Sequence, residues 1–365
     1  MKIAIIADPL DNQNAGVHIY TKAVVEELAR DNRGHEILLI RQKKDGNWPE
    51  LEQIVIPSYR FPGFASLRLF VLVPFMLRKA KADIVLEPAH FGPFNLPKSV
   101  IRATFIHDLT PIKFPKYHRW HSQFLQKLFL GRILKKSKKI ITNSRNTSRD
   151  LEFYYPITIG KNKPIPLAVD SIFKPDHNSI LPKALLFETP YFINLGTIEP
   201  RKNIVRLLAA YEKFRDVSDK KCLLVIVGGE GWKTGEIMSS IKSHKYHSDI
   251  IRPGFIPTDM LPQLMKNSVC LIYPSLYEGF GLPILEAFSV GCPVICSKSS
   301  SMPEVGGEAA FYFDPNQTEE LVDRMLEMAN FDKKSRDIIV QKSLHQASQF
   351  SWKKHVDDLI KYLVS

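Results

Sequence analysis

The sequence predicts an α/β protein built from two doubly wound parallel sheets. Strand-like and helix-like segments alternate from end to end, which is typical of parallel sheets with crossover helices. Several strand-like segments are continuous apolar runs, as expected for strands buried on both faces. A length of 365 residues is sufficient for two domains.

We place the domains at residues 1–170 and 171–350, joined in the proline-bounded stretch Pro166–Pro175. The last helix, within residues 351–365, is expected to pack back on the first domain. Ligands of such sheets bind outside the carboxyl ends of the strands, so we expect both sets of loops to face one cleft. The expected strands are Lys2–Ala7, Glu36–Arg41, Gln53–Pro57, Asp83–Glu87, Thr104–His107, Lys139–Asn143, Ile165–Val169, Tyr191–Leu195, Cys222–Val227, Ile250–Phe255, Val269–Tyr273, Val294–Ser297 and Ala309–Phe313.

Composition and cysteine usage indicate a globular cytoplasmic protein. The chain is 44% hydrophobic and 24% charged, and no stretch approaches the roughly 20 apolar residues of a membrane-spanning helix. The apolar run after Met1 ends at Asp8, which is too short for a signal peptide. The four cysteines match no zinc-site spacing and are expected to be buried thiols in a reducing compartment.

The net charge of +12 lies wholly in the first half of the chain. Residues 1–170 hold 27 Lys and Arg against 15 Asp and Glu, whereas residues 171–365 hold 23 of each. A one-sided basic field indicates an anionic partner, either nucleic acid or the inner membrane leaflet. The segment Leu67–Leu77, followed by Arg78, Lys79 and Lys81, fits equally a helix on a membrane surface or a core helix.

Two loops of the second half carry the chemistry. The first reads Glu199-Pro-Arg-Lys-Asn203 and offers two adjacent cations before a helix that Asn203 is expected to cap. The second reads Glu278-Gly-Phe-Gly-Leu-Pro-Ile-Leu-Glu286, in which Pro283 suits the first helical turn. The N–H groups at such a helix start form an anion site, and a carboxylate one turn later suits the hydroxyls of a ribose.

Together these loops resemble the retaining glycosyltransferases of family 4, which have the GT-B fold of two Rossmann-like domains. The resemblance spans nearly the whole chain. It implies transfer of a sugar from a nucleotide diphosphate donor with retention of configuration. In that family the Arg-Lys pair holds the diphosphate, the last glutamate binds the ribose and the first faces the donor sugar. Gly16 and His107 match a loop glycine and an active-site histidine of the first domain.

The resemblance therefore assigns ten residues. The expected catalytic residues are His107, Arg201, Lys202 and Glu278. The expected donor-binding residues are Gly16, Glu199, Phe280, Gly281, Leu282 and Glu286. No Asp-x-Asp occurs in the chain, so we expect neither a metal nor another cofactor.

The favoured donor is GDP-mannose and the acceptor a glycan or lipid-linked saccharide of cell-surface polysaccharide synthesis, such as lipopolysaccharide. Peripheral contact with the inner face of the cytoplasmic membrane is the accompanying hypothesis. Two alternatives stay open: an epimerase or sugar phosphorylase of the same fold, or a basic nucleic-acid-binding protein. The second leaves the glutamate motif unused and shows no recognition motif, so we expect no nucleic acid partner. A dinucleotide-dependent dehydrogenase is excluded by the missing Gly-x-Gly-x-x-Gly.

Overall fold

A computed structural model of the chain describes residues 1–12, 16–44, 46–59, 63–89, 95–115 and 129–365. The chain divides into two compact units. Unit 1 comprises the described residues of Met1–Lys113, of 129–167 and of Ser351–Ser365; unit 2 comprises Ala168–Phe350 with Phe114 and Pro115. The chain passes between the units at Leu167–Ala168 and returns at Phe350–Ser351.

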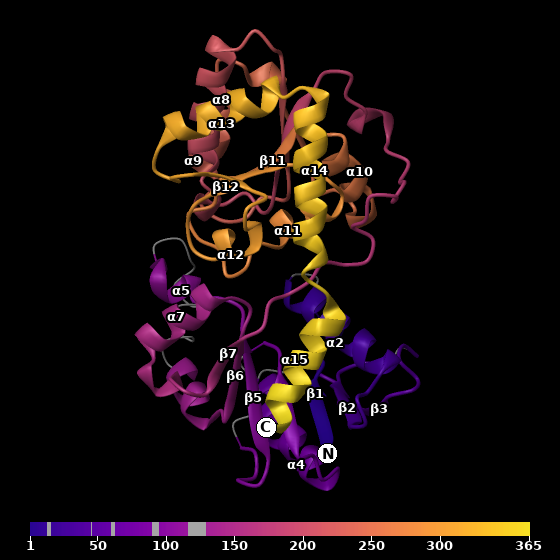
Figure 1. The fold of residues 1–365 in the computed structure, drawn as a ribbon. Coiled ribbons are helices and arrows are strands. Elements are labelled where there is room, and N and C mark those ends of the chain that lie inside the picture. The colour runs from indigo at the N-terminus through magenta and orange to yellow at the C-terminus, as the bar shows by residue number, and fades with distance from the viewer. Residues whose placement is uncertain (13–15, 45, 60–62, 90–94, 116–128) are drawn as a thin grey trace. The chain divides into compact units, whose positions relative to one another are not determined.

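Unit 1 holds a seven-stranded parallel sheet in the order β3-β2-β1-β4-β5-β6-β7 (Figure 1). The order reverses at β1, as in a doubly wound sheet. Its elements are β1 Lys2–Ile6, α1 Pro9–Asn12, α2 Gly16–Arg30, β2 Glu36–Arg41, β3 Glu52–Val55, α3 Phe64–Leu67, a π-helical turn Arg68–Leu72, α4 Val73–Lys79, β4 Ile84–Glu87, β5 Ile101–Ile106, α5 Thr110–Lys113, β6 Lys139–Thr142, α7 Arg145–Tyr154, β7 Asn162–Pro164 and α15 Trp352–Val364.

Helices cover both faces of this sheet. Ala4 and Ile6 of β1 share a core cluster with Val73 and Leu77 of α4. Phe105 of β5 packs instead on Tyr20 of α2, with ring centroids 4.1 Å apart. The helix α15 packs against α2 and β6, although it follows all of unit 2 in the sequence (Figure 1).

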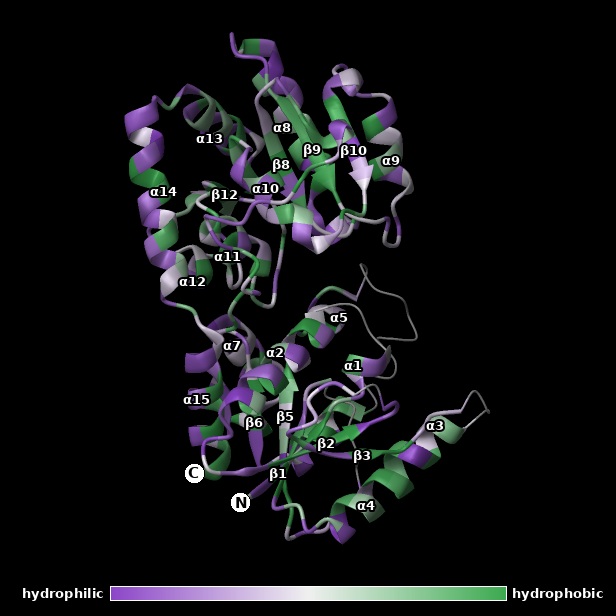
Figure 2. Ribbon diagram, turned by 90° about the vertical axis from the view of Figure 1, so that its right-hand side faces the viewer, coloured by the Kyte–Doolittle hydropathy of each residue, from purple (hydrophilic) through white to green (hydrophobic). Residues whose placement is uncertain are grey.

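Unit 2 holds a six-stranded parallel sheet in the order β10-β9-β8-β11-β12-β13. The fold class predicted from the sequence, two doubly wound parallel sheets, is therefore confirmed. The strands of both sheets are largely apolar, which accounts for their burial (Figure 2). The elements are β8 Tyr191–Leu195, α8 Ile204–Val217, β9 Leu223–Val227, α9 Gly235–Lys242, β10 Ile250–Gly254, α10 Leu261–Lys266, β11 Cys270–Tyr273, α11 Leu282–Ser289, β12 Val294–Ser297, α12 Met302–Gly306, β13 Phe311–Phe313, α13 Thr318–Asn330 and α14 Lys333–Ser348.

One predicted strand is wrong. The strand expected at Ile165–Val169 lies at Asn162–Pro164, where Ile140 to Thr142 of β6 pair with it. Ile165 N still donates to Thr142 O at 2.8 Å, but Pro166 has no N–H to continue the ladder. The predicted burial of all four cysteines as free thiols is confirmed.

Candidate functional site

The loop after β8 places two cations directly before α8. Pro200–Lys202 forms a single 3-10 turn, and Asn203 follows in the left-handed conformation with φ 57°. Asn203 lies at the N-cap position of α8, as predicted, but its side chain has another role. That side chain makes no cap bond and its Nδ2 donates instead to Pro315 O at 3.0 Å. Arg201 and Lys202 are thus held in a tight turn that is tied to a distant segment.

The loop after β11 carries the glutamate motif. It leaves the sheet at Tyr273, passes through Glu278 and enters α11 at Leu282. Gly281 precedes the helix with φ 109°, and a Cβ there would lie 3.3 Å from Ile284 Cδ1. The backbone at Gly281 therefore requires glycine. Phe280 is buried, and its ring lies 6.1 Å from that of Phe350.

The two loops converge on Glu278. Lys202 Nζ lies 2.7 Å from Glu278 Oε1 and 2.8 Å from the Tyr273 hydroxyl. Arg201 NH1 lies 2.8 Å from Glu278 Oε2 and also donates to Tyr277 O. The other terminal nitrogen of Arg201 donates to Glu199. Four of the predicted residues, Glu199, Arg201, Lys202 and Glu278, therefore form one ion-pair network in unit 2.

Burial and ion pairing act in opposite directions on the ionisable groups of this network. Burial opposes the ionisation of Glu278, but Lys202 and Arg201 outweigh it and lower the pKa of that carboxyl to about 2. Burial lowers the pKa of Lys202, against the attraction of Glu278. Burial raises the pKa of Glu199, whose Oε2 has no hydrogen-bond partner among the described residues. Two cations are thus concentrated in a largely desolvated site.

Glu286 lies one turn inside α11, and its pKa is shifted in the opposite direction from that of Glu278. Burial raises the pKa of Glu286 to about 7, and the negative charge of Asp170 adds to this effect. The nearby Lys202 acts in the opposite direction. The two glutamates of the motif are therefore in opposite electrostatic states, with Glu278 ionised and Glu286 poised near neutral pH.

Glycines of the neighbouring loop support the cation-bearing loop. The loop after β9 reads Gly228-Gly-Glu-Gly231, and it packs against Gly196 and Ile198. A Cβ at Gly228 would lie 2.0 Å from Gly196 O, and one at Gly231 would lie 2.8 Å from Thr197 Cγ2. Ile198 N donates to Gly229 O at 2.9 Å, which locks the two loops together.

Three serines after β12 support the glutamate loop, and sequence reasoning missed them. Glu278 N donates to Ser300 Oγ at 2.9 Å. The Ser301 hydroxyl lies 2.9 Å from Glu278 O and 2.7 Å from Phe280 O. Ser299 Oγ donates to Leu276 O at 3.0 Å. The signal was present as a run of short polar residues at the carboxyl end of a predicted strand. Tyr273, the last residue of another predicted strand, was missed in the same way.

His107 and Gly16 belong to unit 1. His107 follows β5, and its Nε2 lies 2.9 Å from Pro88 O. Because a carbonyl only accepts, Nε2 carries the proton and Nδ1 of the neutral ring is an acceptor. Burial lowers the pKa of His107, so the ring is neutral at pH 7. Gly16 begins α2, and a Cβ there would meet no atom of the described residues within 4 Å, so no contact among them requires this glycine.

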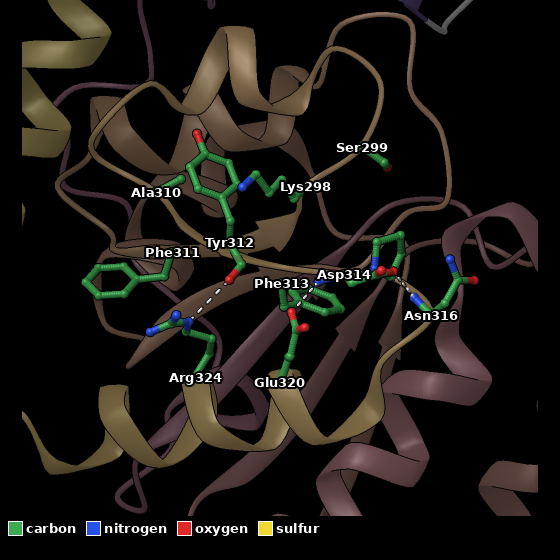
Figure 3. Close-up of a pocket in the computed structure, with 11 residues that line it drawn as sticks. Lys298, Ser299, Ala310, Phe311, Tyr312, Phe313, Asp314, Asn316, Glu320 and Arg324 are labelled. Carbon is green, nitrogen blue, oxygen red and sulfur yellow. Dashed lines mark hydrogen bonds between the residues drawn. The ribbon is translucent and has the colours of Figure 1, made fainter.

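A cavity of about 790 Å³ lies on unit 2 along β13 and α13, beside the loop that carries Ser299 (Figure 3). None of the predicted site residues lines it. Arg324 Nε donates to Tyr312 O at 3.2 Å, and Asp314 N donates to Glu320 Oε2 at 2.7 Å (Figure 3). These side chains form hydrogen bonds with backbone groups at the edge strand β13. We therefore interpret this cavity as a hollow beside a sheet edge that is protected from pairing with another strand.

Within residues 1–12, 16–44, 46–59, 63–89, 95–115 and 129–365, no group of three or more His, Cys, Asp or Glu side chains is arranged to hold a metal ion. No helix among these residues is both long enough and apolar enough to cross a membrane.

Comparison with known proteins places this geometry in a family. Residues 179–346 match the family described as Glycosyl transferases group 1, and residues 15–171 match Glycosyltransferase Family 4. The chain is 33% identical over 280 residues to the O-antigen chain mannosyltransferase B of Escherichia coli, covering 76% of this chain and 72% of that protein. It is 26% identical over 281 residues to the serotype-specific mannosyltransferase WbdA of Escherichia coli, covering 71% of this chain but only 33% of that protein.

Solved structures agree on the fold. The Anabaena protein Alr3699/HepE, solved in complex with UDP and glucose, superposes with a TM-score of 0.71 at 17% identity, covering 100% of this chain and 99% of that one. The architecture is thus that of the two-domain GT-B enzymes. The chain belongs to the group 1, family 4 glycosyltransferases, and the resemblance drawn from the two loops is confirmed.

Proposed function

We propose that this glycosyltransferase moves a hexose, with mannose favoured, from a nucleotide diphosphate donor to a glycan or lipid-linked acceptor, with retention of configuration. The observation that carries the proposal is the convergence of Lys202 and Arg201 on Glu278 at the carboxyl ends of β8 and β11. The names of the relatives, O-antigen and serotype-specific mannosyltransferases, support mannose as the sugar and cell-surface polysaccharide as the product class. We favour GDP-mannose as the donor. Family membership favours transfer over the epimerase, phosphorylase and nucleic-acid-binding alternatives.

The chemistry follows from where charge develops. When the bond between the sugar and the diphosphate breaks, its electron pair goes to the phosphate oxygen. Lys202, Arg201 and the N-terminal end of α11 stabilise that oxygen. The sugar ring becomes positive, and the ionised Glu278 stabilises it. The acceptor hydroxyl adds on the same face, and its proton passes to the departing phosphate.

The remaining candidate residues bind and orient the donor in this proposal. Glu286 accepts hydrogen bonds from the ribose, and Gly281, Leu282 and Phe280 shape the loop around the phosphates. Glu199 holds Arg201 in place. In unit 1, Nδ1 of His107 accepts a hydrogen bond from a sugar hydroxyl, and Gly16 lets the backbone approach the diphosphate. We further propose that no metal is needed, because two side-chain cations supply the charge that a metal would.

A panel of nucleotide sugars tests the donor assignment. The ligand that raises the melting temperature most is expected to be GDP-mannose, since stabilisation grows with affinity. Transfer from it should persist in excess chelator. Lys202→Ala should lower turnover about 100-fold, whereas Lys213→Ala, an exposed lysine of α8, should not. Equal turnover of both variants, or activity restored only by added metal, would contradict this proposal.

A second observation supports contact between unit 1 and a membrane surface. Leu67, Val71 and Phe75 are spaced by four residues and are 48%, 52% and 64% exposed. The opposite face of the same helical segment is buried, because Val73 and Leu77 lie in the core and Arg68 forms a bidentate pair with Asp8 at 2.6 and 2.7 Å.

The interpretation of Leu67–Leu77 as a core segment holds for its inner face, and its exposed outer face leaves the membrane interpretation as a proposal. The segment α3–α4 is strongly apolar (Figure 2), and it ends in the exposed cations Arg78, Lys79 and Lys81. We propose that this outer apolar face lies on an anionic bilayer, such as the inner face of the cytoplasmic membrane. The cytoplasmic location expected from the sequence belongs to the same proposal.

A further inference from the structure

A cluster of aromatic rings surrounds His107 inside unit 1. The ring of His107 lies 4.6 Å from Phe105 of its own strand and 5.5 Å from Tyr20 of α2, which it meets edge-on at 83°. The Tyr20 ring lies in turn 5.5 Å from His355 of α15, at 81°. Three segments far apart in the sequence thus meet behind a predicted catalytic residue.

His355 is itself anchored where the chain crosses between the units. Its Nδ1 lies 2.7 Å from Pro166 O, immediately before the crossing at Leu167–Ala168. Its ring lies 5.3 Å from that of Trp352, immediately after the return at Phe350–Ser351. The hydrogen bond therefore ties the outgoing connection to the returning helix, and both to the ring cluster.

Two polar atoms of the cluster are unsatisfied in the part of the chain that the structure describes. The Tyr20 hydroxyl and His355 Nε2 are buried and have no hydrogen-bond partner among the described residues. Burial raises the pKa of Tyr20 and lowers the pKa of His355 to about 4, so neither ring is charged at neutral pH. The groups facing His107 are then Asp108 on its own segment, Tyr20 from α2 and His355 from α15.

We propose that Tyr20 and His355 are positioning residues for His107. The Tyr20 ring packs against the imidazole of His107 and fixes its plane. His355 packs against Tyr20 in turn and joins the two connections between the units. Orientation matters because Nε2 is committed to Pro88 O and only Nδ1 is left to meet a ligand. This inference rests on the proposed function in one respect, namely that His107 contacts the donor sugar.

Paired variants test the two positioning residues. Tyr20→Phe keeps the ring and should retain kcat. Tyr20→Leu removes the aromatic ring that packs on His107 and should lower kcat about 10-fold with the donor KM unchanged. His355→Asn keeps a hydrogen-bond donor near the Nδ1 position, so it should retain the kcat that His355→Leu loses. The imidazole nitrogens of His107, followed by NMR against pH, should titrate at higher pH in Tyr20→Leu and His355→Leu, because the ring is less shielded from water.

Two controls separate positioning from general damage and from the catalytic assignment. Leu28→Ala removes a buried side chain of the same helix α2 outside the ring cluster, and it should lower the melting temperature without moving the His107 titration. If Leu28→Ala reproduces the effects of Tyr20→Leu, or if the His107 titration is the same in all variants, the positioning role is overturned. If instead His107→Gln keeps full kcat, the role of His107 in the proposed function is wrong. The NMR titration of the Tyr20 and His355 variants still tests whether these rings position His107.

Discussion

Glu278 is paired with the same two cations that we assign to the diphosphate. Lys202 and Arg201 each lie within 2.8 Å of one of its oxygens. A bound diphosphate must therefore compete with a carboxylate that is ionised at any physiological pH, since its pKa is about 2. The cations are held in place by Glu278 before they are needed, which limits the reorganisation that binding requires.

The first prediction concerns this competition. Glu278→Gln removes the competing charge while keeping the shape of the side chain, so free nucleoside diphosphate should bind up to about tenfold more tightly. Transfer should fall about 100-fold, because the positive sugar ring loses its stabilising charge. Calorimetry and a transfer assay on the same preparation measure both effects. Weaker nucleotide binding in this variant would show that Glu278 contacts the nucleotide directly.

The second prediction concerns Glu286, whose burial raises its pKa to about 7. Below that pH the carboxyl is protonated and accepts hydrogen bonds poorly, so nucleoside diphosphate affinity should rise as pH rises through 7 and then level off. Glu286→Gln should bind more weakly at high pH and lose this component of the pH dependence. Since the ligand phosphate also titrates, the difference between wild type and variant is the quantity to measure. An identical pH profile in both proteins would remove Glu286 from the ribose site.

At the scale of elements, the two loops that we propose to bind the donor are held by neighbouring loops. Some of these neighbours leave room for close packing, and others form hydrogen bonds. Gly228 and Gly231 allow the loop after β9 to lie directly against the cation-bearing loop after β8. The serines after β12 then hold the glutamate loop from the other side. The cations and the carboxylate meet because four loops, after β8, β9, β11 and β12, are packed on one another at the carboxyl ends of neighbouring strands.

The third prediction tests this packing. Gly228→Ala places a methyl group 2.0 Å from Gly196 O at a residue whose φ is 143°, so the loop after β8 must move. We expect a loss of about 1–3 kcal/mol in stability and a marked loss of nucleotide affinity. Gly229→Ala is the matched control, because a Cβ there meets nothing within 4 Å. Thermal unfolding and nucleotide titration of both variants measure the difference, and similar behaviour of the two would contradict it.

Features that depend on residues close together in the sequence were predicted correctly, and features that depend on distant partners were not. The sheets, the helix starting after Gly281 and the two donor loops follow from local apolar runs, turns and motifs. The misplaced β7 depends on pairing with β6, and Asn203 depends on Pro315, more than a hundred residues away. Arg68 interrupts an apolar segment in the sequence, but in the fold it is buried against Asp8. Such residues are explained only by partners that local patterns do not contain.

At the scale of the whole molecule, charge and exposed apolar surface are both unequally distributed. The basic excess of +12 lies within residues 1–170, and the outer apolar face of Leu67, Val71 and Phe75 lies in the same part of the chain. Each cation near an anionic bilayer contributes about 1 kcal/mol, and salt screens this term. An apolar face beside such cations suits a surface-bound enzyme whose acceptor is carried by lipid.

The fourth prediction measures this contact. The full chain should cosediment with anionic vesicles at low salt, less at high salt and little with neutral vesicles. The triple change of Leu67, Val71 and Phe75 to serine should abolish cosedimentation, because it removes the inserted face and keeps every cation. Phe153→Ser is the matched control, an exposed aromatic of α7 that is 79% exposed. Unchanged binding by the triple variant would leave electrostatic attraction alone as the cause.

The position of α15 has a consequence for how the protein is made. Unit 1 begins the chain, yet its final helix is translated only after all of unit 2 has been synthesised. That helix buries Val356, Leu359, Ile360 and Leu363, so a nascent chain leaves the matching surface of α2 uncovered until synthesis passes residue 364. Unit 2 is nearly continuous in sequence, so its fold does not depend on α15. A premature stop within α15 would release a polypeptide with a finished donor unit and an open core in unit 1, a substrate for chaperones and proteases.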